Sequence, residues 1–236
     1  MAFSIVIVCR NEEEHIGNCL AAVHGLTDDI VVVDTGSTDG TLDIVRSHPV
    51  RLIQKEWMGY GASKNFAKSE TVHDWVLSID ADEIVDEALF QSLTKWIPVT
   101  DPVFSVKRIN HIGQRAIKHG HLKAEIKLRL FNKTKYSWDD QPVHELLTPK
   151  VSKRNTQLLE GRLLHYQAAS IDDLKRKYEL YAKLTEPKKK LIRSIVPYYH
   201  FVKSYVFQLG FIQGTLGLQL SREAYRYSYQ KLYGPK

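Results

Sequence analysis

The chain has 236 residues, of which 43% are hydrophobic and 25% charged, a balance that excludes a low-complexity protein and suits one large α/β domain with or without an appendage. Its two cysteines, Cys9 and Cys19, form no C-x-x-C pair, and such sparse usage indicates a reducing compartment. Residues 1–100 hold 7 Lys and Arg against 16 Asp and Glu, whereas residues 101–236 hold 26 against 11. This asymmetry predicts an anionic partner, lipid or nucleic acid, for the second half, and the alternative is a solvated basic face with no partner.

Strands and helices are expected to alternate over the first hundred residues. Four aliphatic runs have the composition of buried strands: 3–9, 30–33, 51–53 and 75–79. A helix should follow the first run, capped by Asn11, with Glu12–Glu14 in its first turn and a stop at Gly25. Two more helices are expected, one opening at Thr41 and one over residues 63–69. The alternation predicts a parallel sheet with helices on its faces.

Polar clusters stand where three of these strands end. They are Arg10-Asn11-Glu12, the turn from Asp34 to Asp39, and Asp80-Ala81-Asp82-Glu83. Ligands of open parallel sheets bind outside the carboxyl ends of the strands, so the clusters are expected to converge on one crevice. In an extended chain Asp80 and Asp82 would face the same side, and such carboxylates suit a divalent metal that also binds phosphates. The alternative is a solvated turn that caps the following helix.

The second half of the chain is expected to hold further strands and then helices. Residues 103–106 and 127–131 have the composition of strands. From residue 171 the chain becomes helical and basic, and between Ser194 and Ser221 only Lys203 carries a formal charge. Basic and aromatic helices of this kind indicate an element that lies along a membrane surface. A helical cap on the sheet or a dimer interface is the alternative, and nucleic acid is not expected because no motif for it is present.

The motif order I-V-I-V-C-R-N-E-E, V-V-D-T-G-S-T-D-G-T, K-N and L-S-I-D-A-D-E resembles the inverting glycosyltransferases of family 2, which have the GT-A fold. The later pieces R-L-F and V-H-E resemble a branch that includes lipopolysaccharide core-biosynthesis glycosyltransferases. The resemblance implies an α/β fold, a three-layer α/β/α sandwich around a mostly parallel sheet, with a C-terminal helical tail. Residues 1–168 would form the catalytic domain, with the nucleotide sugar in 1–100 and the acceptor side in 101–168, and residues 169–236 the basic and aromatic tail.

The resemblance also implies roles for individual residues. Those expected to bind the nucleotide sugar are Arg10, Asn11, Glu12, Asp34, Lys64, Asp80, Ala81, Asp82 and Arg129. Asp82, solvated until its ligand binds, would be the main carboxylate of a Mg²⁺ or Mn²⁺ ion, with Asp80 facing the ribose or the metal. Arg129 would meet the diphosphate or else lie on the surface.

An inverting transfer also needs a base that takes the proton of the acceptor hydroxyl. The resemblance assigns this role to Glu145, with Asp139 and Asp140 as competitors and His144 as an orienting side chain. The alternative for Glu145 is a salt bridge to a nearby Lys or Arg.

The implied function is transfer of a sugar from a nucleotide-diphosphate donor, UDP by family expectation, to a hydroxyl of a lipid-linked surface glycan such as the lipopolysaccharide core. The alternatives are a polyprenyl-phosphate sugar transferase and a non-catalytic nucleotide-binding module. The apolar run Ala2–Cys9 has no basic region before it, so no signal peptide is expected. The protein is therefore expected in the cytoplasm, peripheral on the cytoplasmic face of the inner membrane, with a homo-oligomer through the tail as an option.

Overall fold

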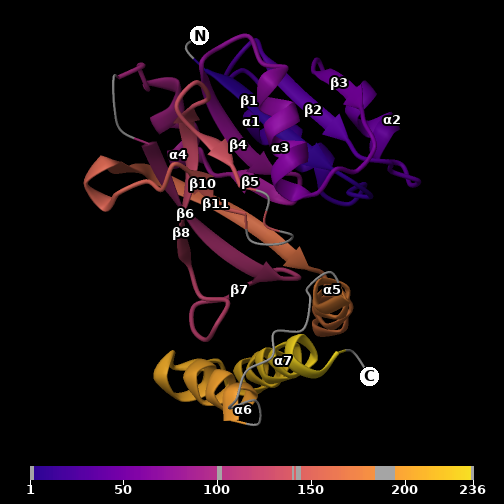
Figure 1. Cartoon of the computed structure of the whole chain (residues 1–236), viewed down its shortest axis with the longest axis vertical. Helices are drawn as coiled ribbons and strands as arrows, with labels where there is room; N and C mark the ends of the chain where they lie inside the picture. The colour runs from indigo at the N-terminus through magenta and orange to yellow at the C-terminus, as the bar shows by residue number, and fades with distance from the viewer. Residues whose placement is uncertain (1–2, 100–102, 140, 142–144, 184–194, 235–236) are drawn as a thin grey trace. The chain divides into compact units, whose positions relative to one another are not determined.

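The computed structural model describes residues 3–99, 103–139, 141, 145–183 and 195–234. The chain forms two compact units, drawn in Figure 1. The sheet unit comprises Met1–Arg108 and Ile126–His165, and the helical unit comprises Ile109–Glu125 and Tyr166–Lys236. Residues 109–125, expected on the acceptor side of the catalytic domain, thus group with the tail, and the expected division after residue 168 stays a prediction.

Among the described residues one mixed sheet has nine strands, with the order β3-β2-β1-β4-β8-β6-β11-β5 and with β7 paired to β6. Their bounds are β1 Ser4–Cys9, β2 Ile30–Asp34, β3 Arg51–Gln54, β4 Trp75–Asp80, β5 Glu83–Val85, β6 Val103–Ile112, β7 Arg115–Ala116, β8 Glu125–Asn132 and β11 Thr156–Ala168. Strands β3, β2, β1 and β4 are parallel, whereas β8 pairs with β4, and β5 with β11, in antiparallel fashion. The sheet is therefore parallel where strands and helices alternate along the chain. A separate hairpin consists of β9 Ser137–Trp138 and β10 Leu147–Thr148.

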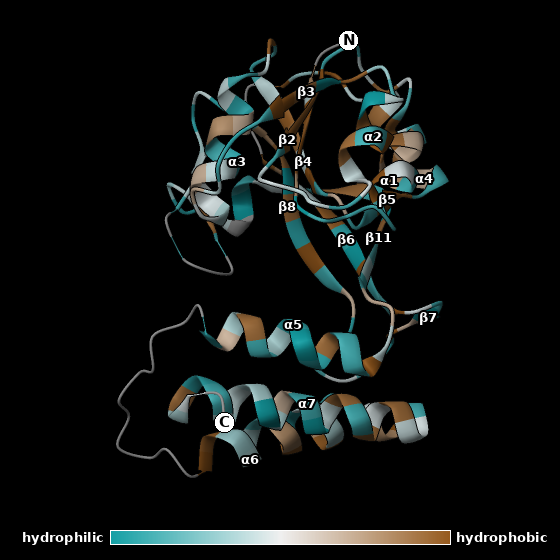
Figure 2. Cartoon of the chain, turned by 90° about the vertical axis from the view of Figure 1, so that its right-hand side faces the viewer, coloured by the Kyte–Doolittle hydropathy of each residue, from teal (hydrophilic) through white to brown (hydrophobic). Residues whose placement is uncertain are grey.

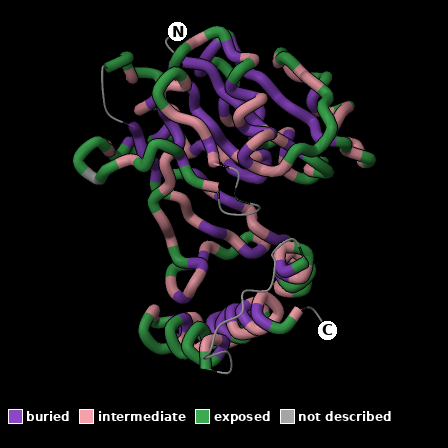
Figure 3. The backbone as a smooth tube through the Cα atoms, viewed as in Figure 1, coloured by how far each residue is buried: buried purple, intermediate pink, exposed green. Residues whose placement is uncertain are grey.

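Alternate side chains of the parallel strands enter two separate cores, one on each face of the sheet. Four helices cover these faces: α1 Ile16–Val23, α2 Thr41–Arg46, α3 Tyr60–Ser69 and α4 Glu87–Thr94. Ile5 and Ile7 of β1 pack in one core with side chains of α1, α2 and α4, whereas Val6 packs in the other core with Ala67 of α3. The parallel strands β1, β2 and β4 are almost entirely buried, whereas the edge strand β3 is not (Figure 3). Helices pack on both faces of the sheet, so the expected three layers, α/β/α, are confirmed. A short 3₁₀ turn, η1 Lys153–Asn155, precedes β11.

Helix α1 begins later than the sequence predicted. Asn11 has a left-handed backbone with φ of 55°, and α1 starts at Ile16 with no acidic residue in its first turn. The expected cap at Asn11 and the expected place of Glu12–Glu14 are therefore wrong, because these residues form a loop that binds a neighbouring turn. The stop at Gly25 is confirmed, since α1 ends at Val23 and Gly25 has φ of 83°.

The helical unit is built from α5 Ile171–Lys183, α6 Ile195–Val202, the π-helical turn η2 Lys203–Phe207, the 3₁₀ turn η3 Gly210–Gln213 and α7 Gly214–Tyr233. Its apolar core joins Ile112, Ile117 and Leu122 to Leu174 of α5 and Leu220 of α7. Figure 2 shows that α5 and α7 mix polar and apolar residues along their length. Among the described residues no helix is long and apolar enough to cross a membrane.

Four polar side chains of the helical unit form a hydrogen-bond network. The His121 ring hydrogen-bonds to the Tyr178 hydroxyl through Nε2 at 2.9 Å and to the Ser204 hydroxyl through Nδ1 at 3.3 Å. Ser204 in turn hydrogen-bonds to Ser221 of α7 at 3.0 Å. Burial lowers the pKa of His121 to about 4, with a smaller contribution from His200. The imidazole therefore joins α5, η2 and α7 as a neutral group.

Protonation of His121 should destabilise the helical unit in acid. The folded pKa lies below the ordinary value of 6.5, so between about pH 6.5 and pH 4 the unfolded chain binds a proton that the folded chain does not. Stability should fall over this window by at most about 3 kcal/mol. Urea unfolding followed by the near-ultraviolet circular dichroism of the tyrosines should show the loss. His121→Gln should remove this pH dependence and the exposed control His24→Gln should not; an unchanged slope in His121→Gln contradicts the assignment.

Candidate active site

The two strands that flank β1 each end in an aspartate. In the parallel register Asp34, the last residue of β2, stands beside Cys9, and Asp80, the last residue of β4, stands beside Val8. The carboxyl ends of parallel strands lie at the same edge of a sheet. The register therefore brings Asp34 and Asp80 to one edge, as the sequence predicted.

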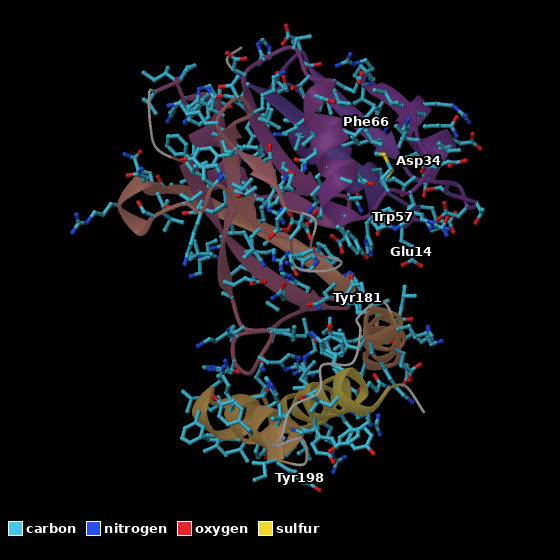
Figure 4. All side chains as sticks on the ribbon, in the orientation of Figure 1. Glu14, Asp34, Trp57, Phe66, Tyr181 and Tyr198 are labelled. Carbon is cyan, nitrogen blue, oxygen red and sulfur yellow. The ribbon has the colours of Figure 1, made fainter. Side chains whose placement is uncertain are left out.

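Asp34 is fully buried and its carboxylate closes the turn that follows β2. Its Oδ1 accepts hydrogen bonds from the backbone N–H groups of Gly36 and Ser37, at 3.0 Å each, and its Oδ2 accepts one from the Ser37 hydroxyl. The Cys9 thiol also points at Oδ2, at 3.8 Å. Asp34 therefore fixes the shape of this turn at the sheet edge (Figure 4).

The loop after β1 is hydrogen-bonded along this turn. The N–H of Asn11 donates to the Ser37 hydroxyl at 2.9 Å, and the N–H of Thr38 donates to the Asn11 side-chain oxygen at 2.8 Å. The N–H of Glu12 donates to the Thr41 hydroxyl at 2.8 Å. Arg10 is exposed at the start of the loop. Two of the three expected strand-end clusters thus form one wall, made mostly of backbone and short polar side chains.

Lys64 of α3 joins the end of β4 to a segment far along the chain. Its Nζ lies 2.8 Å from Asp80 Oδ1 and donates a hydrogen bond to Glu145 Oε1 at 2.5 Å. Lys64 is only 7% exposed, and its Nζ also lies 5.2 Å from the centre of the Trp138 ring. Burial alone would lower the pKa of Lys64, but the carboxylates of Asp80 and Glu145 outweigh burial and raise it. The ammonium group is therefore held charged between two acids.

The position of Glu145 depends on close packing between α3 and the β9–β10 hairpin. Asn65, next to Lys64, receives a hydrogen bond from the N–H of Trp138 at 2.9 Å and donates one to its carbonyl at 2.8 Å. Gly61 permits this approach, because a Cβ there would lie 1.9 Å from the carbonyl oxygen of Asp139. Asp139 and Leu146 are hydrogen-bonded across the hairpin at 2.9 Å in both directions. These contacts place Glu145 against Lys64.

Asp80 belongs to a buried cluster of two carboxylates and two guanidinium groups. Arg129 of β8 donates to Asp80 Oδ2 at 2.8 Å and also to Glu83 Oε1, while Arg108 of β6 donates to Glu83 Oε1 at 3.2 Å. Glu83 is fully buried, and its second oxygen accepts the N–H of Asp80 at 3.0 Å. Burial would raise the pKa of Asp80, but Arg129, Lys64 and Arg108 hold it well below its usual range. Arg129 is thus a buried residue that binds the carboxylates of Asp80 and Glu83. The alternative prediction, that Arg129 lies on the surface, is wrong because the residue is only 3% exposed.

Asp82 and Ala81 lie in a turn between β4 and β5 and not in an extended strand. Ala81 is buried in the core, and Asp82 is 8% exposed with its Oδ2 at 3.2 Å from Nε2 of His165. The expected alternation of Asp80 and Asp82 along an extended chain is therefore wrong. The expected solvation of Asp82 is also wrong, because His165 of β11 covers it.

The Asp82–His165 pair has the chemistry of a divalent metal site. A carboxylate oxygen and an imidazole nitrogen are both ligands of Mn²⁺. Their separation of 3.2 Å is close to the roughly 3 Å between neighbouring ligands of an octahedral ion with bonds of about 2.1 Å. The described residues contain no group of three or more His, Cys, Asp or Glu side chains that could hold a metal ion. An ion here would therefore complete its shell with diphosphate oxygens and water, as Mg²⁺ sites commonly do.

Three side chains of this region had no role in the sequence prediction: Glu83, Arg108 and His165. Glu83 stood in the D-A-D-E motif, and burial of its carboxylate could not be foreseen from the motif. Arg108 and His165 are single residues on β6 and β11, and nothing in their spacing points to Asp80 or Asp82. Asp140 and His144, expected as a competing base and an orienting side chain, lie outside the described residues.

Comparison with known proteins identifies the family. Residues 4–149 match the family model described as glycosyl transferase family 2, so the chain belongs to that family and has its GT-A type of α/β fold. It is 31% identical over 192 residues to the lipopolysaccharide core biosynthesis glycosyltransferase LpsC of Rhizobium meliloti, a match covering 78% of this chain and 70% of the relative. It is 30% identical to the uncharacterized glycosyltransferase RT0209 of Rickettsia typhi, over 80% of this chain and 68% of that one.

A solved structure with a similar region is glucosyl-3-phosphoglycerate synthase from Mycobacterium tuberculosis, crystallised with Mn²⁺, UDP and glucosyl-3-phosphoglycerate. The identity is 24% and the TM-score 0.37, and the match covers 47% of this chain and 44% of the synthase. The match therefore spans less than half the length of that structure, whereas it spans about two thirds of LpsC and of RT0209.

Removal of the Arg129 guanidinium should destabilise the sheet unit strongly. Arg129→Met would leave the fully buried Glu83 with a poorer complement of positive charge, which typically costs about 3–5 kcal/mol when one partner of a buried pair is lost. The control is Arg46→Met, because Arg46 pairs with Asp43 on the surface and such pairs contribute about 0–1 kcal/mol. Urea denaturation of both variants measures the difference. Equal stability of the two variants would contradict the importance of the cluster.

Proposed function

We propose that this protein transfers a sugar from a nucleoside diphosphate donor to a hydroxyl of a lipid-linked surface glycan such as the lipopolysaccharide core, with inversion at the anomeric carbon. UDP is the nucleotide that we propose for the donor. The observation that carries the proposal is the contact of Lys64 with both Asp80 and Glu145. It joins, at the carboxyl edge of the sheet, the side chains that donor binding and acceptor activation would need. The similarity to LpsC supports the acceptor class.

The donor would bind along the wall formed by the loop after β1 and the turn after β2. Arg10, Asn11, Glu12 and the turn held by Asp34 would contact the nucleoside, with Asp80 and Ala81 at its ribose side. Lys64, held charged, would meet the diphosphate. Arg129 would act on the donor through Asp80, whose carboxylate it keeps ionised and in place.

The metal would be Mg²⁺ or Mn²⁺, held by Asp82 and His165, and its positive charge would neutralise the charge that develops on the departing nucleoside diphosphate. Asp80, which the sequence suggested as a second metal ligand, is better suited to orienting Lys64 than to binding metal, because Lys64, Arg129 and Arg108 already surround its two oxygens.

Glu145 would be the base. In an inverting transfer the acceptor oxygen attacks the anomeric carbon, the bond to the diphosphate breaks, and the hydroxyl proton passes to a carboxylate. The hydrogen bond from Lys64 holds the Glu145 carboxylate at this edge of the sheet. When the ammonium group turns toward the diphosphate, Glu145 becomes available to the acceptor.

A lipid-linked acceptor would be met at a membrane surface, and we propose that the protein acts at the cytoplasmic face of the inner membrane. The basic composition of residues 169–236, with 13 Lys and Arg against 5 Asp and Glu, supports attraction to anionic lipid. The alternative acceptor is a polyprenyl phosphate, which is already anionic and needs no strong base.

Nucleotide binding should depend on metal through Asp82 and His165. UDP at 100 times its dissociation constant should stabilise the wild-type protein by about 2.7 kcal/mol in the presence of Mn²⁺. Asp82→Asn and His165→Asn should lose the Mn²⁺-dependent part of this stabilisation, because each removes one proposed ligand, while the exposed control Asp43→Asn keeps it. A thermal-shift panel with UDP, GDP, dTDP and CMP, each with and without Mn²⁺, makes the measurement. Full metal dependence in both variants rejects the proposed metal site, and no shift with any nucleotide in the wild type rejects the donor class.

Glu145→Gln should abolish most of the transfer while donor binding survives. Loss of a general base typically lowers kcat by about 10²–10⁴-fold, whereas Lys64 keeps its second partner, Asp80, in the variant. The measurement is UDP release from UDP-sugars with lipopolysaccharide core acceptors, beside UDP binding by thermal shift. Glu160→Gln, an exposed carboxylate on β11, is the matched control. Unchanged turnover by Glu145→Gln with a polyprenyl phosphate acceptor would favour the alternative acceptor.

A further inference from the structure

Large apolar side chains are exposed along one segment of the helical unit. Of the nineteen large hydrophobic residues that are exposed in the described parts of the chain, nine lie between residues 195 and 212. They are Ile195, Tyr198, Tyr199, Val202, Val206, Phe207, Leu209, Phe211 and Ile212, with Phe207 74% exposed. A concentration of this kind marks an interaction surface, because a folded protein gains stability by burying such side chains.

The same segment is anchored to the rest of its unit by small and polar residues. Pro197, Ser204 and Gly210 are its buried residues, and the Ser204 hydroxyl hydrogen-bonds to Ser221 of α7. Gly217 of α7 permits a close approach to the segment, since a Cβ there would lie 1.8 Å from the carbonyl oxygen of Gly210. The segment thus turns its small residues toward α7 and leaves its large ones outward. Packing within the helical unit fixes this orientation.

Tyrosines border the exposed apolar residues. The Tyr198 ring, labelled in Figure 4, lies 5.0 Å from the ring of Tyr225 on α7, which continues to Tyr229 at 6.3 Å and then to Tyr233 at 4.6 Å. Nine of the twelve tyrosines of the chain occur in residues 169–236. Tyrosine is enriched where a protein meets the boundary between lipid and water, because its ring is apolar and its hydroxyl polar.

The charge of this region decides between possible occupants of the surface. Lys203 is the one formal charge within residues 195–212, and its Nζ lies 5.9 Å from the exposed Tyr199 ring. With 13 Lys and Arg against 5 Asp and Glu in residues 169–236, two copies of the chain would repel each other, whereas an anionic lipid surface would attract this region.

We propose that Ile195–Ile212, the docking segment, binds the surface of an anionic lipid bilayer, with its apolar side chains in the headgroup region and the surrounding basic residues on the phosphates. The continuous helical part, 195–207, has 13 residues and a length of roughly 20 Å, which suits a helix lying in the plane of the surface. The proposal rests on the proposed function in one respect, that the acceptor is carried by a lipid.

Vesicle binding by the full chain tests the docking segment. The wild-type protein should co-sediment with vesicles of phosphatidylcholine and phosphatidylglycerol, bind pure phosphatidylcholine more weakly, and be partly released by high salt. The double variant Phe207→Ser/Ile212→Ser should bind the anionic vesicles at least about tenfold more weakly, because two exposed apolar side chains are lost. Lys203→Glu should weaken binding to anionic vesicles alone.

The matched control is Val72→Ser/Ile97→Ser, which removes two apolar side chains, also exposed by more than half, from the sheet unit. This control should bind vesicles like the wild type. All variants should keep the melting temperature and the UDP shift of the wild type, because the substituted residues lie on the surface and outside the candidate active site.

Three results would overturn the proposal. One is failure of the wild type to bind anionic vesicles, and a second is equal weakening by the control variant. The third is a wild-type dimer, seen by light scattering, that Phe207→Ser/Ile212→Ser dissociates, since the surface would then join two copies. Failure of the proposed function is a separate outcome, because loss of UDP binding in the wild type leaves the vesicle result unaffected.

Discussion

Neutralisation of buried acids is the constraint on which the candidate active site depends. Glu83 is completely buried and its carboxylate could not remain there unpaired, and the partly exposed Asp80 lies beside it at the end of a central strand. Arg129, Arg108 and Lys64 supply the opposite charge from β8, β6 and α3. The acids therefore tie the parallel half of the sheet to the strands that follow it.

The same ion pairs also bring together the side chains to which the proposed function assigns roles. Lys64 contacts both Asp80 and Glu145, so under the proposed function one side chain would connect the donor side with the acceptor side of the reaction. Its place is set by ordinary packing: Gly61 lets α3 approach the β9–β10 hairpin, and Asn65 binds the backbone of Trp138. A site held in this way needs little rearrangement before the donor arrives.

The helical unit follows a different rule. Its inward residues are mostly aliphatic, small or neutral polar, and His121 remains uncharged among them. Its outward residues between 195 and 212 are large and apolar, inside a region rich in Lys, Arg and Tyr. A surface of that composition is suited to a boundary between water and lipid, and the fold itself does not require it.

The sequence by itself determined the four parallel strands and three of the helices of the first hundred residues, the family, and the meeting of Asp34 and Asp80 at one edge. Local composition and the geometry of parallel sheets are sufficient for the strands, the helices and the shared edge, whereas the family followed from the resemblance of the motifs. Only the tertiary structure decided the rest. Arg108, Arg129 and His165 are single residues on strands distant in sequence, and their approach to Asp80, Glu83 and Asp82 depends on sheet order. The short-range prediction failed at Asn11 and Asp82 for the same reason, because a turn and a histidine from elsewhere in the chain bind them.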